Sequence, residues 1–215
     1  MIDSELEMIP EGWKVGKLNE IVNTIKGVSY SSDELKESEK ALVTLKSMNR
    51  GGGLNKNGFK EFIGKYKQEQ EIIDGDIVLA CTDLTQKAEV IGKPAIVRTI
   101  SKYVALIASL DLVIIRPKNN QANKPFLYYL LNSENFQSHV QGFTNGTTVL
   151  HLSSKAIPEY FLAIPNKEII SRFSNSIQHL LDYKRDNEAQ SEILIEIRDS
   201  LLPKLMSGEI RINVK

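Results

Sequence analysis

A glycine-rich stretch between residues 45 and 60 concentrates side chains that are suited to bind nucleic acid. Its sequence, LKSMNRGGGLNKNGFK, places basic, amide and hydroxyl groups around three consecutive glycines. Arginine can pair with guanine, asparagine with adenine, and lysine or serine with phosphate, while glycine lets a backbone approach another surface closely. The stretch predicts a hairpin tip that contacts DNA, although a solvated loop that is simply basic remains an alternative. The residues predicted to contact DNA here are Lys46, Ser47, Asn49, Arg50, Asn55 and Lys56.

Two further polar loops have no obvious role in a core. They are TDLTQK (82–87) and TNGTT (144–148). Their hydroxyl, amide and ammonium groups are of the kinds that contact phosphates and base edges. We expect both loops to face DNA together with loop 46–57, through Thr82, Asp83, Thr85, Lys87, Asn145, Thr147 and Thr148.

The sequence lacks the patterns that carry catalysis or hold a metal. It contains no G-x-x-x-x-G-K-[ST] phosphate loop, no H-E-x-x-H helix and no G-x-S-x-G elbow. The carboxylates in DGD (74–76) and CTD (81–83) suggest either a metal site or turn residues that accept backbone N–H groups, and we favour the second interpretation. We therefore predict no catalytic residue, no metal and no cofactor. The histidines are interpreted as surface or packing residues: His139, His151 and His179.

Composition limits the remaining classes of protein. The chain has 215 residues and a formal net charge of +0, which argues against a nonspecific polyanion binder. Cys81 is the only cysteine, so an internal disulfide and a cysteine-rich zinc site are excluded. The N-terminal stretch is acidic without an apolar segment typical of a signal peptide, and no apolar run approaches the ~18 residues that span a membrane. We expect a cytoplasmic protein that does not contact a membrane.

Residues 1–165 are predicted to form a mixed α/β domain. Short β-rich runs occupy 41–48, 76–81, 94–100, 110–117 and 160–165, separated by glycine and asparagine turns. Residues 123–143 have a helical apolar pattern, with Asn123 as the N-cap. The fold class is therefore α+β, with this domain followed by a different kind of element.

Residues 166–205 are predicted to form a long helix. The segment 166–202 contains neither Pro nor Gly, Asn166 can cap its start, and at 1.5 Å per residue it would be roughly 55 Å long. That length favours pairing with a second helix as a coiled coil, whereas an amphipathic helix lying on its own domain remains an alternative. The predicted dimerisation residues are Phe173, Ile177, Leu180, Leu194, Ile197 and Leu201.

The charges of this helix suggest an antiparallel pair of two copies. An acidic stripe includes Glu188, Glu192, Glu196 and Asp199, and Lys167 and Arg172 lie at the opposite end. Pairing centred near Lys184 would place Arg172 beside Glu196 and Lys167 near Asp199.

The C-terminal stretch IRDSLLPKLMSGEIRI (197–212) predicts a defined helix end. Pro203 disfavours helical geometry at Leu202, so we expect the helix to stop or kink there. Gly208 is the expected C-terminal stop, and residues 206–215 form a predicted tail strand that joins a neighbouring module.

Four motifs in order resemble the DNA-specificity subunit of type I restriction-modification systems. They are IPEGWKVGKL (9–18), GDIVLACTDLT (75–85), NGTTVLHLSSKAI (145–157) and IRDSLLPKLMSGEI (197–210). The resemblance covers essentially the whole chain, and LLPKLMSGEI is its most specific part. It implies a target-recognition domain over 1–165 and a conserved spacer helix over 166–205.

The resemblance also implies function and partners. Such subunits are non-catalytic, recognise one half of a split double-stranded DNA site with each recognition domain, and dock adenine methyltransferase (M) subunits, through which restriction motor (R) subunits join. The usual subunit has two modules, whereas this sequence has one. Two copies forming a homodimer, or a longer natural subunit of which this is half, both account for that. A coiled-coil protein–protein scaffold with an α/β binding head is the alternative from another class.

Overall fold

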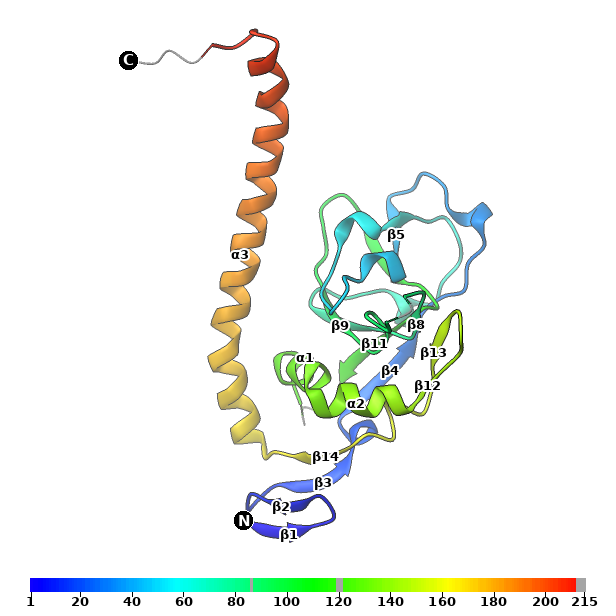
Figure 1. Cartoon of the computed structure of the whole chain (residues 1–215), viewed down its shortest axis with the longest axis vertical. Coiled ribbons are helices and arrows are strands. Elements are labelled where there is room, and N and C mark those ends of the chain that lie inside the picture. The colour runs from blue at the N-terminus through cyan, green and yellow to red at the C-terminus, as the bar shows by residue number, and fades with distance from the viewer. Residues whose placement is uncertain (86, 119–121, 212–215) are drawn as a thin grey trace. The chain divides into compact units, whose positions relative to one another are not determined.

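The computed structural model describes residues 1–85, 87–118 and 122–211, without the side chain of Glu192. These residues form two units, Met1–Ser171 and a second unit from Arg172 onward. The first unit is the mixed α/β domain and the second is nearly all helix, as the sequence predicts (Figure 1). None of the helices in the described part combines the length and apolar character needed to cross a bilayer.

A four-stranded antiparallel sheet lies at the centre of the first unit. Its order is β4-β11-β7-β9, and Ile77 and Val113 are among the residues at its middle. The central strands are rich in β-branched residues, which suit a pleated sheet. The bounds are β4 (Val22–Lys26), β11 (Leu112–Pro117), β7 (Asp76–Ala80) and β9 (Pro94–Val97).

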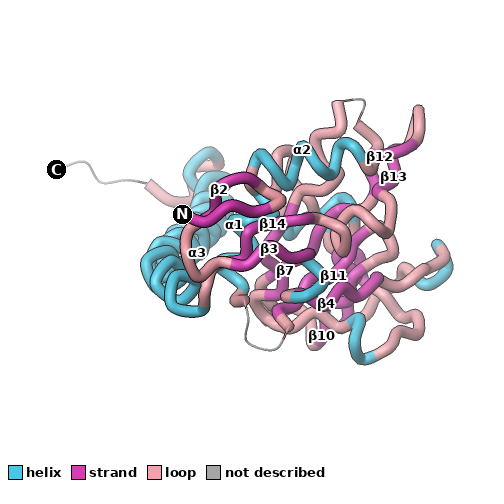
Figure 2. Tube along the Cα trace, turned by 90° about the horizontal axis from the view of Figure 1, so that it is seen from below, coloured by secondary structure: helices cyan, strands magenta, loops and turns pink. Residues whose placement is uncertain are grey.

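This sheet is buried on both faces, and its side chains alternate between two cores. Ile77 and Leu79 pack with helices α1 (Lys124–Asn132) and α2 (Glu134–Gly142). Val78 and Ala80 pack on the other face, against the sheet β10-β5-β6. Figure 2 shows α2 and β10 on opposite sides of the central strands. This second sheet contains β10 (Ala105–Ala108), β5 (Lys40–Val43) and β6 (Lys60–Glu61), with β10 and β5 parallel.

Three smaller sheets complete the first unit. They are β12-β13-β8, β14-β3 and the hairpin β1-β2. Their bounds are β12 (Thr144–Asn145), β13 (Leu150–Leu152), β8 (Thr82–Asp83), β14 (Phe161–Ile164), β3 (Lys14–Lys17), β1 (Ile2–Ser4) and β2 (Glu7–Ile9). Short 3-10 turns lie at Leu18–Glu20, Ser32–Glu34, Leu45–Ser47, Lys56–Gly58 and Gln68–Gln70.

The helix predicted over 123–143 is two helices, which corrects the prediction. Ser133 separates them with extended backbone (φ −65°, ψ 148°) and caps α2 by accepting a hydrogen bond from the Phe136 N–H. Serine at such a position competes with the helix for backbone groups, so the chain turns there. The predicted cap at Asn123 is confirmed, because its side chain accepts from the Phe126 N–H at 3.1 Å.

The long helix α3 runs over Lys167–Met206, and Pro203 lies inside it. The helix therefore does not stop at Leu202, which corrects that part of the prediction. Pro203 has no N–H to donate to the Asp199 carbonyl, but its own carbonyl still accepts from the Ser207 N–H at 2.9 Å, so the last turn of the helix forms after it. The helix ends as predicted at Gly208 (φ +76°), whose N–H donates to the Leu205 carbonyl.

The predicted tail strand is not present in the described residues. Residues 207–211 form turns and bends, and residues 212–215 lie outside the described part. A strand needs a partner for its backbone groups, and the described residues of the second unit, 172–211, contain no strand to supply one. The predicted cap of α3 is confirmed, since Asn166 accepts from the Ile169 N–H at 3.0 Å.

Candidate nucleic-acid interface

The glycine-rich loop is a compact turn whose two ends are joined by one β-bridge. Met48 and Leu54 form the bridge, and the Asn49 N–H donates to the Gly53 carbonyl at 3.0 Å. All three glycines of 51–53 have positive φ values, of 79°, 103° and 87°. L side chains rarely adopt this backbone conformation, so the three consecutive glycines are required by the turn itself.

The side chains of this loop differ in exposure. Lys46, Asn49 and Arg50 are exposed. Two of the residues predicted to contact DNA bind their own loop: the Asn49 amide donates to the Leu54 carbonyl at 3.1 Å, and the Asn55 amide donates to the Lys46 carbonyl at 3.3 Å. These bonds tie both amides to the backbone of the loop, while Asn49 stays exposed and Asn55 is half-buried.

Ser47 does not face DNA, contrary to the prediction. Its side chain is fully buried and accepts a hydrogen bond from the Thr44 N–H at 3.0 Å. The Thr44 hydroxyl in turn donates to the Gly58 carbonyl at 3.1 Å. Ser47 therefore closes the base of the loop from inside. Lys56, also predicted to contact DNA, is half-buried at the far side of the same loop.

The second predicted loop is organised by one buried carboxylate. Asp83 is fully buried, and it accepts backbone N–H bonds from Thr85 (2.6 Å), Val90 (2.6 Å) and Ile91 (2.9 Å). Burial alone would raise the pKa of Asp83, but the hydrogen bonds from Thr85 and from these backbone groups lower it below its ordinary value. The prediction that Asp83 contacts DNA is therefore corrected: an inward carboxylate holds the loop.

The other members of this loop lie nearer the surface. Lys87 is exposed, and Thr82 and Thr85 are half-buried. The Thr82 hydroxyl donates to the Asp111 carboxylate at 2.9 Å, and the Thr85 hydroxyl accepts from the Glu89 N–H at 3.0 Å. Of the four predicted residues, Lys87 is thus the one with an exposed side chain.

The third predicted loop is a reversal between β12 and β13 that leaves its polar residues exposed. Asn145, Thr147 and Thr148 are all exposed. Gly146 between them has φ +118°, and a Cβ there would come 2.1 Å from the Val149 carbonyl oxygen. The reversal therefore requires glycine and presents its neighbours outward.

Backbone hydrogen bonds join the three loops into one surface, which we call the loop face (residues 46–57, 82–91 and 144–149). The Gly51 N–H donates to the Glu89 carbonyl at 2.9 Å, and the Gly53 N–H donates to the Pro94 carbonyl at 3.1 Å. Strand β13 pairs with both β8 and β12, which places the third loop beside the second (Figure 1). The structure thus brings together segments separated by about half the chain.

One ion pair crosses the loop face. The Arg50 guanidinium lies 3.5 Å from the Glu89 carboxylate, with side-chain exposures of 75% and 35%. An ion pair this exposed contributes about 0.2–1 kcal/mol. Arg50 is therefore held near the surface without being committed to Glu89.

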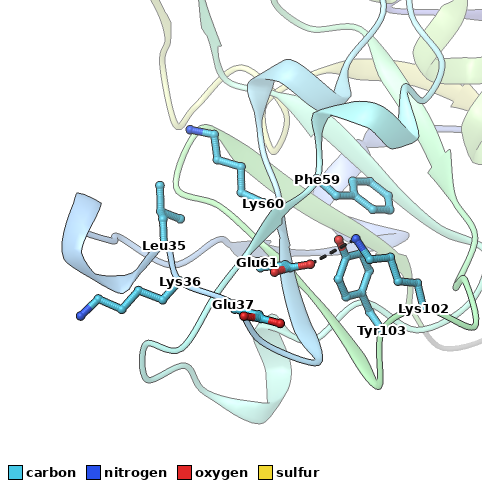
Figure 3. A pocket seen from close by; sticks show the side chains of 8 residues that line it. All are labelled: Leu35, Lys36, Glu37, Phe59, Lys60, Glu61, Lys102 and Tyr103. Atoms are coloured by element: carbon cyan, nitrogen blue, oxygen red, sulfur yellow. Dashed lines mark ion pairs between the residues drawn. The ribbon is translucent and has the colours of Figure 1, made fainter.

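A shallow hollow of about 420 Å³ lies beside the glycine-rich loop (Figure 3). Its charges are largely matched, since Lys102 pairs with Glu61 at 3.1 Å and lies over the Tyr103 ring at 4.9 Å. Figure 3 shows the Lys60 side chain directed away from that pair. The hollow is open to solvent and is not an enclosed ligand site. Its lining is Leu35, Lys36, Glu37, Phe59, Lys60, Glu61, Lys102 and Tyr103.

The carboxylates of DGD (74–76) accept hydrogen bonds from backbone N–H groups and form ion pairs with basic side chains. Asp74 accepts from the Thr99 N–H at 2.9 Å, and Asp76 accepts from the Ile73 N–H at 3.0 Å, which confirms the turn interpretation. Asp76 also binds Arg116 (2.7 Å) and Lys124 (3.0 Å), which sequence reasoning missed because both partners are distant in the chain. Within the described ranges, no group of His, Cys, Asp and Glu is placed to hold a metal ion.

The second unit carries the predicted dimerisation residues on α3. Leu180 and Leu194 are 61% and 64% exposed, and Ile197 and Leu201 are 47% and 41% exposed. Phe173 and Ile177 lie on the same predicted stripe nearer the helix start. Exposed leucine and isoleucine at helical spacing are typical of a surface that another helix covers.

Comparison with known proteins identifies the family. Residues 10–196 match the family model of the type I restriction modification DNA specificity domain. The chain therefore belongs to this family. A curated relative, the type I restriction enzyme MjaIX specificity subunit of Methanocaldococcus jannaschii, is 26% identical over an alignment 215 residues long, which covers 95% of this chain and 46% of the relative.

Solved structures show the same fold. The type I restriction-modification S subunit from M. genitalium superposes with a TM-score of 0.64 at 14% identity, over 93% of this chain and 48% of that chain. A chain in a structure on complex assembly and conformational transition of the type I restriction-modification system superposes with a TM-score of 0.52 at 17% identity, over 92% of this chain and 46% of that one. The chain thus spans about half the length of the relatives it matches.

Proposed function

We propose that this chain is a non-catalytic DNA-recognition module that binds one half of a split double-stranded site through the loop face. The observation that carries the proposal is the hydrogen-bonded union of three polar loops on one rigid surface. Membership of the specificity-domain family supports it. Recognition by loops on a rigid scaffold is a common arrangement for binding sites.

The exposed residues of the loop face have different proposed roles. Lys46 and Lys87 contact phosphates, which positions the module without sequence preference. Arg50 leaves Glu89 and contacts the edge of a guanine base. A bidentate arginine–guanine pair discriminates against a wrong base by about 1–3 kcal/mol, which exceeds the contribution of the exposed ion pair with Glu89. Asn49 and Asn145 are the proposed amide contacts to bases, and Asn55, Lys56, Thr147 and Thr148 support them.

We infer that α3 joins two copies, and that the resulting homodimer docks the methyltransferase subunits and, through them, the motor subunits. The exposed apolar residues of α3 support the pairing. An antiparallel arrangement would relate two loop faces by two-fold symmetry, so the preferred site would be a palindrome interrupted by a gap. The helix of 40 residues is ~60 Å long, which accommodates half-sites ~34 Å apart.

Selection from a pool of random duplex DNA tests the proposal. Bound and unbound duplexes are sequenced, and affinity for the enriched site is then measured by fluorescence anisotropy over a series of salt concentrations. Counterion release predicts a steep fall of affinity with salt. Lys46→Ala should weaken binding to all sequences and reduce the salt slope by about 1, whereas Arg50→Ala should cost about 1–3 kcal/mol and relax specificity at one position.

A matched control separates these effects from a change in total charge. Lys14→Ala removes the same charge on β3, which Figure 1 shows at the end of the first unit away from β5. It should leave affinity and salt slope unchanged. A dimer that enriches no sequence and shows no salt-dependent binding would instead support the protein–protein scaffold.

A further inference from the structure

The N-terminal hairpin β1-β2 is a small sheet with an apolar and acidic surface. Ile2 pairs with Ile9 and Ser4 with Glu7. Met1, Ile2 and Met8 are exposed by 71%, 43% and 54%. The acidic residues of this stretch are Asp3, Glu5, Glu7 and Glu11, and no Lys or Arg precedes Lys14. Exposed apolar side chains on a short sheet suggest a surface that is covered in an assembly.

Strand β1 offers the regular edge of this hairpin. In β2, Glu7 has φ +65° and Pro10 follows directly after the strand. A residue in the left-handed region interrupts a ladder, and proline has no N–H to donate. Within the described residues, β1 pairs only with β2, so its outer backbone groups are available to a further strand.

The C-terminal tail has the complementary pattern. After Gly208 ends α3, the sequence is EIRINVK, in which Ile210, Ile212 and Val214 alternate with Arg211, Asn213 and Lys215. Strict alternation of apolar and polar residues is typical of a β-strand with one covered face. Ile210 is 39% exposed. The basic side chains of the tail match the acidic hairpin in charge.

Antiparallel pairing of α3 brings these two elements together between copies. When Arg172 lies beside Glu196, counting five residues outward along each helix brings Leu201 of one copy opposite Lys167 of the other. The residues beyond Met206 then continue past the start of the second helix. The hairpin's exit lies at that start, because a Cβ on Gly12 would be 3.7 Å from the Asn166 amide nitrogen.

We propose that, in the dimer, the segment that begins at Glu209 adds to β1 of the second copy as a third strand of the hairpin sheet. Ile210 then shares a face with Ile2 and Ser4, while Arg211 shares the other face with Asp3. The pairing satisfies the backbone groups of both strands and covers apolar residues of each. This inference rests on the proposed α3 homodimer and adds a second contact between the two copies, at each end of the helix pair.

Disulfide cross-linking between two variants, each with one introduced cysteine, tests the pairing. Chains carrying Ile210→Cys also carry a removable fusion, so that they differ in size from the second variant. They are mixed with chains carrying Ile2→Cys or Ser4→Cys, and the mixture is oxidised. Side chains on one face of adjacent strands can reach disulfide distance, so a hetero-dimer of intermediate size should form with one of the two partners. Burial raises the pKa of the native Cys81 thiol to about 12, so it should not compete.

Asp3→Cys is the matched control, because its side chain points to the opposite face of β1. Efficient linking of Ile210→Cys to position 2 or 4, with little to position 3, supports the proposal. Equal linking to all three, or to none, overturns it.

Sedimentation of the unmodified chain separates this inference from the function on which it rests. A dimer that gives no cross-link overturns the strand pairing alone, and a monomer overturns both the dimer and the pairing. A chain ending at Gly208 provides a second measurement, because it keeps all of α3. Its dimer dissociation constant should rise at least tenfold, and an unchanged constant contradicts the pairing.

Discussion

Replacing Asp83 by alanine would leave three backbone N–H groups without their acceptor. The bonds from Val90 and Ile91 are buried, whereas the bond from Thr85 is only part-buried and can be replaced by water. Each buried N–H left unpaired costs about 1–3 kcal/mol. We expect Asp83→Ala to lower the free energy of unfolding of the recognition domain by about 3–5 kcal/mol. Asp83→Asn keeps one oxygen and should lose about half as much.

Urea unfolding followed by fluorescence measures this loss. Trp13 is the only tryptophan and lies in the first unit, so its emission reports on that unit rather than on α3. With a urea dependence of about 2 kcal/mol/M, Asp83→Ala should lower the midpoint by about 1.5–2.5 M. Midpoints of both variants within about 0.3 M of wild type would refute the assignment of Asp83 as the organiser of the loop.

Acidification provides a second measurement on the same carboxylate. The pKa of Asp83 is lowered in the folded protein, so its contribution is fully present above the unfolded pKa of about 3.9 and is lost as pH falls through the folded value. The stability difference between wild type and Asp83→Asn should therefore shrink below about pH 4. A difference that stays constant down to about pH 2 would contradict this reasoning.

Three further predictions concern other parts of the chain. Asp76→Ala should destabilise the recognition domain by about 3 kcal/mol in urea, because it leaves two cations without their buried carboxylate, and Asp76→Asn should be milder. Gly92→Ala should cost about 1–3 kcal/mol, since φ is +71° and a Cβ would lie 2.4 Å from Val140 Cγ1; adding Val140→Ala should restore only part of the loss. Arg172→Glu should weaken self-association about fivefold in sedimentation, because an exposed pair of about 0.5 kcal/mol occurs twice, and adding Glu196→Arg should restore it; no rescue would remove the antiparallel register.

Local sequence patterns predicted much of the secondary structure. The β-branched runs at 76–81 and 110–117 became β7 and β11, because such residues pack well on a pleated surface buried on both faces. The long segment after Asn166 that contains neither Pro nor Gly became α3. Strands β3, β4 and β10 were missed, because a short run does not by itself distinguish a strand from other structure.

The predictions that failed depended on which backbone groups a side chain binds and on how deeply it is buried, neither of which residue type alone decides. Ser133 divides a helical pattern because its side chain caps the next helix, and α3 continues past Pro203 to Met206 although proline has no N–H to donate. The inward orientation of Ser47 and Asp83 depends on backbone groups that the fold brings to them. A polar residue in a loop looks the same in a sequence whether it faces solvent or holds the loop from inside.

By itself the sequence determined the fold class, the long helix, the helix caps and the three polar loops, because these depend on composition and on neighbours within a few residues. Only the tertiary structure decided that the loops form one face, through bonds such as Gly51 to Glu89 and the pairing of β13 with β8. It also decided which loop residues are exposed enough to reach DNA. The physical reason is that burial and hydrogen-bond partners are set by contacts between residues far apart in the chain.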